Sequence, residues 1–410
     1  MNSIKEKVPY PSDWKVKKLG ELGEFLKGKG ISKSETIESG LPCIRYGEIY
    51  TRHHDYIKEF YSFVDEDTAN KSTEIMKGDI LFAGSGETAE EIGKSVAYLH
   101  EEKAYAGGDI IILRTKDVDS KYLAFALNEG RLAKERAKLG QGHSVVHIYP
   151  KELKELIIHL PSEIEQQKIA SILSTWDKAI ELKEKLIEQK KEQKKGLMQK
   201  LLTGEVRLPG FEGEWRQVRL GKLTKLQGGY AFKSTEFVKQ GIPIIRISNI
   251  APEITDTNQD FVYYDEVEIS DSFKVNFGDI LIAMSGATTG KVGLYKNREL
   301  AYLNQRVGKF VNLDESKLDY SFLYHLVMSS TFKLQLKEEL ATGAQPNISS
   351  KQIENFKFNI PPLDEQKKIS RTLNQIDRSI ILQEKEIALL KHQKQGLMQL
   401  LLTGKVRVKV

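Results

Sequence analysis

An internal repeat at an offset of about 200 residues constrains this chain more than any other feature. The segment GLMQKLLTG at 196–204 recurs as GLMQLLLTG at 396–404, and 24 of the 45 positions in 163–207 are identical in 363–407. A sequence that occurs twice in one chain predicts a structural unit that occurs twice. The length of 410 residues suits this, because one domain typically takes about 100–200 residues. We therefore expect two related units of about 200 residues each.

Outside these segments the two copies match less closely, but in the same order. Trp14 aligns with Trp215, and the turn Gly78-Asp79-Ile80-Leu81 aligns with Gly278-Asp279-Ile280-Leu281. Two similar segments suit one repeated task, such as binding two identical partners. Two diverged domains suit two different tasks of the same kind.

The repeated segments have the spacing of coiled-coil helices. Ser162 followed by Glu165 is a capping box that begins the first helix, and Gly204 and Gly404 are expected stops. Apolar residues follow in steps of four and three, which is a heptad pattern interrupted by polar residues in the middle. Gly196 and Gly396 are expected to loosen the last turns. The predicted seam is Ile169, Leu173, Trp176, Ile180, Ile187, Leu197 and Leu201, repeated as Ile369, Leu373, Ile376, Ile380, Ile387, Leu390, Leu397 and Leu401.

Neither helix can bury its apolar stripe alone. About 40 helical residues span roughly 60 Å, and the simplest partner for each helix is the other one. A pseudo-two-fold axis perpendicular to the helices would make the pair antiparallel, with the globular domains at its opposite ends. The alternative is that each stripe packs on its own domain.

The globular parts are expected to be mixed α/β (α+β) domains. Short apolar runs between Gly, Asn and Asp turns predict strands, and one helix follows in each half near 121–138 and 319–340. The expected strands are 75–83, 95–99 and 109–114 in the first half, and 242–247, 279–284, 291–295 and 307–311 in the second. The predicted organisation is a domain at 1–160, a central helix at 161–207, a second domain at 208–360 and a C-terminal helix at 361–410.

Composition excludes several protein classes. No stretch approaches 18 consecutive apolar residues and the N-terminus has no apolar signal core, so a cytoplasmic protein without a membrane span is expected. Cys43 is the only cysteine, which rules out an intrachain disulfide and a cysteine-based zinc site. The net charge of +5 resides in the helical segments, because 1–160 carries −2 and 211–360 carries 0 while 161–210 carries +2 and 361–410 carries +5. Charge alone therefore does not indicate a nucleic-acid-binding protein.

Catalytic motifs are mostly absent. Gly93-Lys94-Ser95 resembles the end of a phosphate-binding loop, but Thr88 occupies the position of its first Gly, and a turn between strands is favoured. No Rossmann motif or zinc-protease motif is present, and we expect no metal and no cofactor on this chain. Asp79 and Asp279, which follow Gly, are expected to cap backbone N–H groups in a turn.

Several short motifs in combination resemble the specificity subunit of type I restriction-modification enzymes. They are W-x5-G at Trp14 and Trp215, the G-D-I-L turns, Ser285–Lys291, the L/I-P-x-x-x-E-Q segments that begin the helices, and the GLMQ tails. The likeness covers essentially the whole chain in the order that this family shows. The first half departs from it at Ser85-Gly86-Glu87, where three extra residues precede Gly93-Lys94.

This resemblance implies two target recognition domains separated by spacer helices. Each domain would recognise one half of a split double-stranded DNA target. The helices would set the spacing and bind two modification subunits, which hold S-adenosylmethionine and methylate adenine, and two restriction subunits could join through them. The chain itself would have no catalytic site. The alternative is a non-catalytic coiled-coil scaffold whose domains bind protein, which the near-neutral domains leave open.

Base contacts are expected from polar loop residues, since Arg recognises guanine and Asn or Gln recognises adenine. The candidates in the first domain are Lys29, Arg45, Arg52, His53, Ser85, Lys94, His143, Ser144 and His147. Those in the second are Tyr230, Lys233, Arg246, Asn249, Ser285, Thr288, Thr289, Lys291, Gln345 and Asn347.

Overall fold

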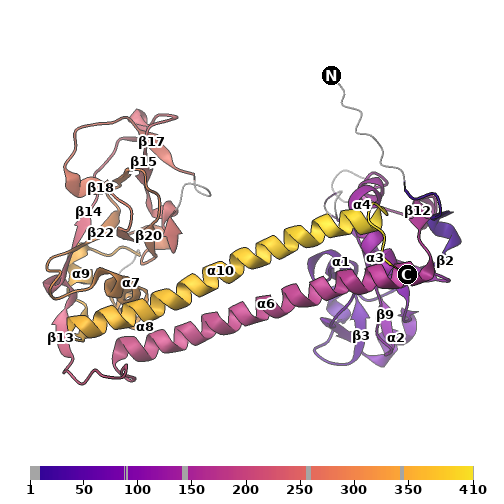
Figure 1. Ribbon diagram of the computed structural model, residues 1–410, viewed down its shortest axis with the longest axis horizontal. Helices are drawn as coiled ribbons and strands as arrows, with labels where there is room; N and C mark the ends of the chain where they lie inside the picture. The colour runs from indigo at the N-terminus through magenta and orange to yellow at the C-terminus, as the bar shows by residue number, and fades with distance from the viewer. Residues whose placement is uncertain are drawn as a thin grey trace. The chain divides into compact units, whose positions relative to one another are not determined.

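The chain folds as two compact units, each built from parts that lie far apart in the sequence. The computed structural model describes residues 10–86, 88, 91–140, 146–254, 260–341 and 346–409. One unit is Met1–Glu184 with Lys385–Val410, and the other is Lys185–Glu384. Each therefore contains one globular domain, half of helix α6 (Glu163–Thr203) and half of helix α10 (Leu363–Leu402), which Figure 1 shows as continuous helices.

The domain of the first unit contains two four-stranded sheets. One has the order β2-β10-β6-β8 and is antiparallel; the other has the order β4-β3-β9-β5, in which β3 and β9 run parallel. Short ladders join β1 to β12 and β7 to β11. The strands are β1 (Lys15–Lys18), β2 (Gly23–Lys27), β3 (Leu41–Ile44), β4 (Ser62–Val64), β5 (Thr73–Ile75), β6 (Asp79–Ala83), β7 (Ser85–Gly86), β8 (Ser95–Ala97), β9 (Ala104–Ala106), β10 (Ile110–Thr115), β11 (Val146–His147) and β12 (Ile157–Leu160). The α-helices are α1 (Tyr46–Thr51), α2 (Glu66–Lys71), α3 (Ser120–Asn128), α4 (Gly130–Ala137) and α5 (Pro150–Lys154).

The domain of the second unit repeats this plan with a longer sheet. Its sheets have the orders β14-β22-β19-β20-β16 and β17-β15-β21-β18, and β13 pairs with β23. The strands are β13 (Arg216–Arg219), β14 (Thr224–Gly228), β15 (Ile242–Ile245), β16 (Glu253–Ile254), β17 (Val262–Tyr264), β18 (Lys274–Val275), β19 (Ile280–Ala283), β20 (Val292–Tyr295), β21 (Ala301–Leu303), β22 (Val307–Asn312) and β23 (Lys357–Ile360). The α-helices are α7 (Tyr320–Met328), α8 (Ser330–Leu340) and α9 (Ser350–Glu354). The mixed α/β fold class is confirmed.

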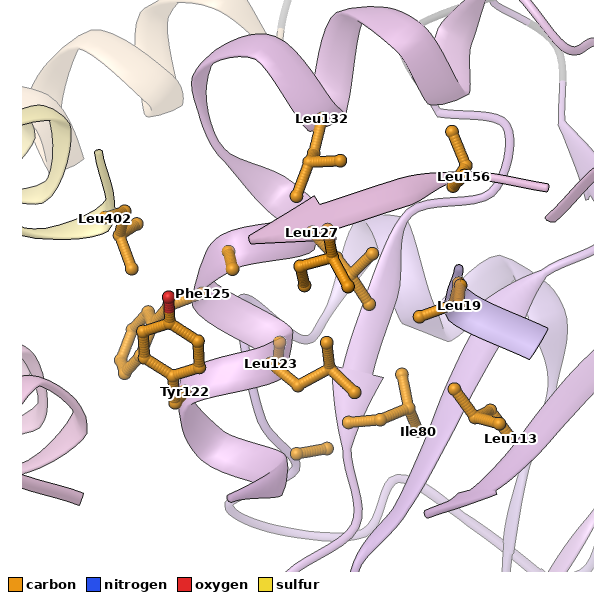
Figure 2. Close-up of a cluster of buried hydrophobic side chains, with 14 of the residues drawn as sticks. Leu19, Ile80, Leu113, Tyr122, Leu123, Phe125, Leu127, Leu132, Leu156 and Leu402 are labelled. Atoms are coloured by element: carbon orange, nitrogen blue, oxygen red, sulfur yellow. The ribbon is translucent and has the colours of Figure 1, made fainter. Parts of the chain in front are cut away.

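The core of each unit is completed by the last turns of a long helix. In the first unit, Leu401 and Leu402 of α10 belong to the same buried cluster as Tyr122 and Leu123 of α3, and Figure 2 shows Leu402 beside Tyr122. In the second unit, the tail of α6 at Leu201 and Leu202 joins the equivalent cluster around Phe322 and Leu323 of α7. The repeated GLMQ tail is therefore a core segment of the unit in which it ends.

Within each unit the two helix segments run antiparallel, as predicted. In the first unit Lys394 pairs with Asp177 at 2.6 Å, and Lys391 pairs with Glu184 at 2.7 Å. Moving toward the C-terminus of α6 thus means moving toward the N-terminus of α10. The second unit contains the repeat counterparts of these pairs, Lys194–Asp377 at 2.5 Å and Lys191–Glu384 at 2.9 Å. Among the polar residues that interrupt the heptad pattern, Lys194 and Lys394 form such cross-helix ion pairs.

The predicted seam residues are buried or half-buried. The fully buried ones are Ile169, Leu173, Ile180, Ile187, Leu201, Ile369, Leu373, Ile380, Ile387 and Leu401. The half-buried ones are Trp176, Leu197, Ile376, Leu390 and Leu397. The two ends of the stripe differ from its middle, because Ile169 and Leu173 pack into the domain core of the first unit and Ile369 and Leu373 into that of the second. The alternative of packing on a domain thus describes the first turns of each helix.

Several local expectations need correction, among them the strand expected at 75–83, which is the end of β5 and all of β6 with a turn between them. The helix expected at 121–138 is two helices, since Glu129 between α3 and α4 is extended and Gly130, the first residue of α4, has a φ of 57°. The helix expected at 319–340 is divided at Ser329, whose side chain caps α8. The strand expected at 242–247 ends at Ile245, and a 3-10 helix begins at Ile247. Gly196 and Gly396 do not interrupt their helices, which continue to Thr203 and Leu402. Only half of the expected capping box forms: the Glu165 N–H donates to Ser162 Oγ at 3.3 Å, while the Glu165 carboxylate pairs with Arg407.

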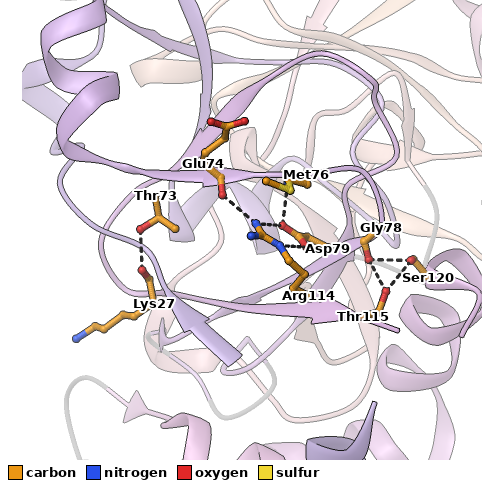
Figure 3. A network of polar contacts seen from close by, with 9 residues as sticks. All are labelled: Lys27, Thr73, Glu74, Met76, Gly78, Asp79, Arg114, Thr115 and Ser120. Atoms are coloured by element: carbon orange, nitrogen blue, oxygen red, sulfur yellow. Dashed lines mark hydrogen bonds and ion pairs between the residues drawn. The ribbon is translucent and has the colours of Figure 1, made fainter. Parts of the chain in front are cut away.

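The G-D-I-L turns have the structure expected of them. Asp79 accepts a hydrogen bond from the Met76 backbone N–H at 2.9 Å and pairs with Arg114 at 2.9 Å, as Figure 3 shows. In the second unit Asp279 accepts from the Asn276 N–H at 2.8 Å. Both aspartates are turn residues that cap backbone donors.

Candidate nucleic-acid interface

The predicted base-contacting residues lie on loops that the two domains hold with the same backbone hydrogen bonds. These bonds join the loop after β2 or β14 to the end of β9 or β21, and they join the turn after β9 or β21 to the end of β3 or β15. They also join the residue after β6 or β19 to that turn and to the segment before α5 or α9. In the first domain they are Lys29 N to Ala106 O (3.2 Å), Gly107 N to Ile44 O (2.9 Å), Gly84 N to Asp109 O (2.7 Å) and Ile148 N to Gly84 O (3.1 Å). In the second they are Tyr230 N to Leu303 O (2.8 Å), Asn304 N to Ile245 O (3.2 Å), Met284 N to Arg306 O (2.9 Å) and Ile348 N to Met284 O (2.9 Å).

The loops around Gly93 and Gly290 also match, although the first has three extra residues. Gly93 N donates to Ala83 O and Gly290 N donates to Ala283 O, both at 2.8 Å. Both glycines have a positive φ, 66° and 85°, a conformation that other residues rarely adopt. Lys94 and Lys291 therefore leave equivalent turns, and the Gly-Lys motif is a turn between strands, as expected.

In the first domain, Arg45 and Arg52 line an open cavity of about 830 Å³. Arg45 pairs with the buried carboxylate of Glu48 at 3.0 Å, and Arg52 lies over the Tyr61 ring at 5.3 Å from its centre. Lys29 is an exposed residue near the same loops. This part of the domain offers guanidinium groups and an aromatic ring on a concave surface.

Other candidates of the first domain form buried contacts. The His53 ring is only 4% exposed, and its burial lowers its pKa to about 4. Lys94 donates to the His53 carbonyl at 2.9 Å, and burial lowers the pKa of the Lys94 ammonium. Ser85 and His147 meet across the β7–β11 ladder, with Oγ and Nδ1 at 2.9 Å. His143 and Ser144 lie outside the described residues.

In the second domain, the loops at 246–249 and 285–289 contact each other directly. Arg246 donates to the Asp260 carbonyl at 3.2 Å, and its backbone N–H donates to Asn249 Oδ1 at 2.9 Å. Thr288 Oγ1 donates to the Ile247 carbonyl at 3.2 Å, which ties the second loop to the first. Asn249 is 3% exposed, so it supports the loop from inside.

The remaining candidates of the second domain surround this pair of loops. Ser285 forms a β-bridge with Asn347, at the position where the first domain pairs Ser85 with His147, and Thr289 bonds to the Pro346 carbonyl. Lys291 is exposed, and Lys233 pairs with Glu236 at 3.1 Å. Tyr230 is 44% exposed and packs on Phe232 at 5.0 Å between ring centres. Gln345 lies outside the described residues.

Three buried polar atoms in the described part of the second domain have no hydrogen-bond partner. Two of them, Arg246 Nε and Ser285 Oγ, belong to the two contacting loops, and the third is Nδ1 of His325 in α7. A buried donor without a partner is costly, and such atoms often belong to a site that another molecule completes.

Two groups of residues at these sites were not predicted from the sequence. One is the turn Asn304-Gln305-Arg306, which follows β21 and lies against the candidate loops. Its position directly before a predicted strand, and its three amino-acid types suited to base contacts, were the available signal. The other is the ion pair that anchors each helix tail. Arg207 binds Glu365 through Nε at 2.6 Å, and Arg407 binds Glu165 through Nε at 2.7 Å.

Within the described residues there is no group of His, Cys, Asp or Glu arranged to hold a metal ion. The thiol of Cys43 is buried, and burial raises its pKa to about 12, so it stays protonated. No helix in the described ranges has the length and apolar character needed to span a membrane.

Comparison with known proteins gives one consistent answer. The family model described as "Type I restriction modification DNA specificity domain" matches twice, at residues 11–191 and 212–392. The specificity subunit of the type I restriction enzyme MjaVIII from Methanocaldococcus jannaschii is 30% identical, over 97% of this chain and 94% of that protein. The EcoKI specificity subunit from Escherichia coli is 24% identical over 89% of this chain and 82% of its own.

Solved structures agree in fold. The S subunit of a type I restriction-modification system from M. genitalium matches with a TM-score of 0.59 at 17% identity, covering 97% of this chain and 98% of that one. A chain from a structural study of complex assembly in the type I system matches with a TM-score of 0.62 at 17% identity, covering 98% of this chain and 100% of that one. At this identity the likeness concerns the fold alone.

Proposed function

Because this chain belongs to the family of type I restriction-modification DNA specificity proteins, we propose that each of its globular domains recognises one half of a split DNA target. The observation that carries this proposal is the shared loop frame with different side chains. Equivalent backbone bonds hold Ser85 and His147 in one domain and Ser285 and Asn347 in the other. One frame that presents two sets of donors and acceptors suits two different half-sites.

The two long helices are the proposed spacer and docking surface. A helix of 41 residues is roughly 60 Å long, which corresponds to about 18 base pairs at about 3.4 Å each. Their repeated sequence would present the same surface twice, which suits two copies of a methyltransferase subunit. Restriction subunits could join through those copies.

The chemistry would belong to the partner subunits. The methyltransferase subunits would hold S-adenosylmethionine and transfer its methyl group to adenine, while this chain would select the DNA. Its domains are close to neutral, with net charges of −2 for 1–160 and 0 for 211–360. Phosphate contacts dominate DNA affinity, so much of this contact would come from the partners, and this chain alone would bind DNA weakly.

The experiment is to map adenine methylation in DNA from a host that carries this chain with its partner methyltransferase. The proposal expects a motif with two constant half-sites separated by a gap of constant length. An active complex that methylates an unsplit motif, or sites without sequence preference, would refute it.

A further inference from the structure

The turn Asn304-Gln305-Arg306 of the second domain has a hydrogen-bonded backbone and exposed side chains at Gln305 and Arg306. The Val307 N–H donates to the Asn304 carbonyl at 2.9 Å, so Asn304–Val307 form a β-turn with Gln305 and Arg306 at its corner. The Asn304 N–H is held by the Ile245 carbonyl, and the Arg306 carbonyl accepts from Met284. Gln305 and Arg306 are exposed, and within the described part of the chain their side chains make no hydrogen bond or ion pair.

This turn is attached to the loops that carry the other candidates. Ile245 directly precedes Arg246, and Met284 directly precedes Ser285. These two neighbours contain the buried polar atoms without a partner, Arg246 Nε and Ser285 Oγ. Within the described residues, the unpaired guanidinium of Arg306 thus belongs to a turn whose backbone is bonded to the two loops that contain these donors.

The equivalent turn of the first domain is Gly107-Gly108-Asp109, and it differs in kind. It has no long side chain, and a Cβ on Gly107 would lie 3.2 Å from Ile31 Cβ, closer than such atoms usually approach. Gly108 and Asp109 instead line the cavity of about 830 Å³ beside Arg45 and Arg52. Where the second domain has an exposed Gln and Arg, the first has part of a cavity wall.

We propose that Arg306 is a specificity-determining residue that contacts a guanine in the half-site of the second domain. The guanidinium fork matches the O6 and N7 acceptors of guanine in the major groove, and this is a common base-specific contact of Arg. Gln305 beside it contacts the neighbouring base pair. The equivalent turn of the first domain has no arginine, so its half-site is recognised without this contact. This inference rests on the proposed function, and it adds the residue and the base.

The test uses the full chain assembled with its methyltransferase subunits and S-adenosylmethionine. Methylation rates are measured on a matched duplex and on duplexes in which each guanine of the motif is replaced singly. For the wild-type chain, one guanine in one half-site is strongly preferred. In Arg306→Ala the methylation rate on the matched duplex falls, whereas the rate on the duplex that lacks the preferred guanine does not. The ratio of the matched rate to the substituted rate therefore drops about tenfold or more. Arg306→Lys retains part of the preference.

Arg298→Ala is the matched control. Arg298 is an exposed arginine of the same domain, and it precedes β21 whereas Arg306 follows it. Its replacement removes the same charge and leaves every ratio unchanged. If methylation by Arg306→Ala is too slow to measure, binding of the complex to the same duplexes gives the ratio.

Two results would overturn the inference. In the first, Arg306→Ala keeps the wild-type ratio of matched to substituted rates at every guanine; in the second, it loses preference equally in both half-sites. A wild-type complex that methylates no split motif would instead refute the proposed function, and that outcome is visible before any variant is made. Thermal unfolding of each variant, expected to match the wild type, separates these results from misfolding.

Discussion

In the first domain β9 is followed by Gly107-Gly108-Asp109, whereas in the second domain the equivalent strand β21 is followed by Asn304-Gln305-Arg306. The carbonyl of the third residue in each turn accepts a hydrogen bond from an equivalent position, Gly84 or Met284. The backbone frame has stayed the same and the side chains have not. The backbone of this turn and its exposed side chains have therefore diverged independently, as the proposed recognition of two different half-sites requires.

The helix tails show the opposite behaviour. Arg207 and Glu365 in one unit repeat Arg407 and Glu165 in the other, and both glutamates are buried to 1% exposure or less. Trp215 donates from Nε1 to Glu365 at 3.1 Å, while Asp13 gives Arg407 a second carboxylate at 2.8 Å. Here the chemistry is retained because it holds each tail in its core.

The largest expected effect comes from breaking this tail contact. Arg207→Ala leaves the Glu365 carboxylate buried without its cation, and we expect the second unit to lose more unfolding free energy than any other variant described here. The equivalent change, Arg407→Ala, should cost less, because that side chain is 42% exposed against 29% for Arg207. Urea unfolding measures both. Lys200→Ala, which removes an exposed pair with Glu205, is the control and should change little. Equal small losses in all three variants would contradict this account.

The two domains also differ in how their stability should depend on pH. Only the first domain has histidines among its candidate residues. The single histidine of 208–360 is His325, which bonds to Asn374 of α10. Burial lowers the pKa of His53 to about 4, below its unfolded value near 6.5. The unfolded chain therefore takes up the proton first, so the stability that neutral His53 provides is present above pH 6.5 and is lost as the pH falls toward 4. Between pH 7 and pH 5 this amounts to about 2 kcal/mol.

His53→Gln should remove this part of the pH dependence of stability. His54→Gln, which changes an exposed histidine, should leave it unchanged. Urea unfolding of the three proteins at pH 7 and pH 5 provides the measurement. If the His53→Gln protein loses as much stability between the two pH values as the wild type does, the burial argument for His53 fails.

A smaller effect is expected from Arg246 and Arg45, which directly follow β15 and the residue-for-residue equivalent strand β3. Arg246→Ala should weaken binding at one half-site by about tenfold, and Arg45→Ala at the other. Methylation rates on duplexes with single substitutions in either half measure this. A loss that falls equally on both halves in either variant would count against separate recognition.

The contrast between the similar helices and the diverged domains also determines which parts of the structure could be predicted from the sequence. The helices, their antiparallel pairing and the buried seam followed from heptad spacing and a 24-in-45 repeat, because packing of a stripe such as Ile180 depends on periodicity. The G-D-I-L turns followed from the preference of Gly and Asp for such positions.

The candidate sites were harder to predict from the sequence, because contact between loops depends on strand order. Arg306 and Arg246 are 60 positions apart, and only the parallel pairing of β15 with β21 brings their loops together. The break at Ser329 was missed because apolar spacing continues through it on both sides. His53 was assigned to a polar loop, yet its ring is 4% exposed, since long-range packing sets burial.

The measurement that tests the central claim most directly replaces one domain by the other. Residues 15–160 would be exchanged for a second copy of 216–360, a junction that keeps a tryptophan before and a proline after the inserted domain. The inserted domain would meet Ile169, Leu173 and Met398, the repeat counterparts of the Ile369, Leu373 and Met198 that it packs on now. Methylation mapping of the assembled complex should then show one half-site unchanged and the other replaced by a second copy of it. An unchanged motif, or a change in both halves, would contradict recognition by separate domains.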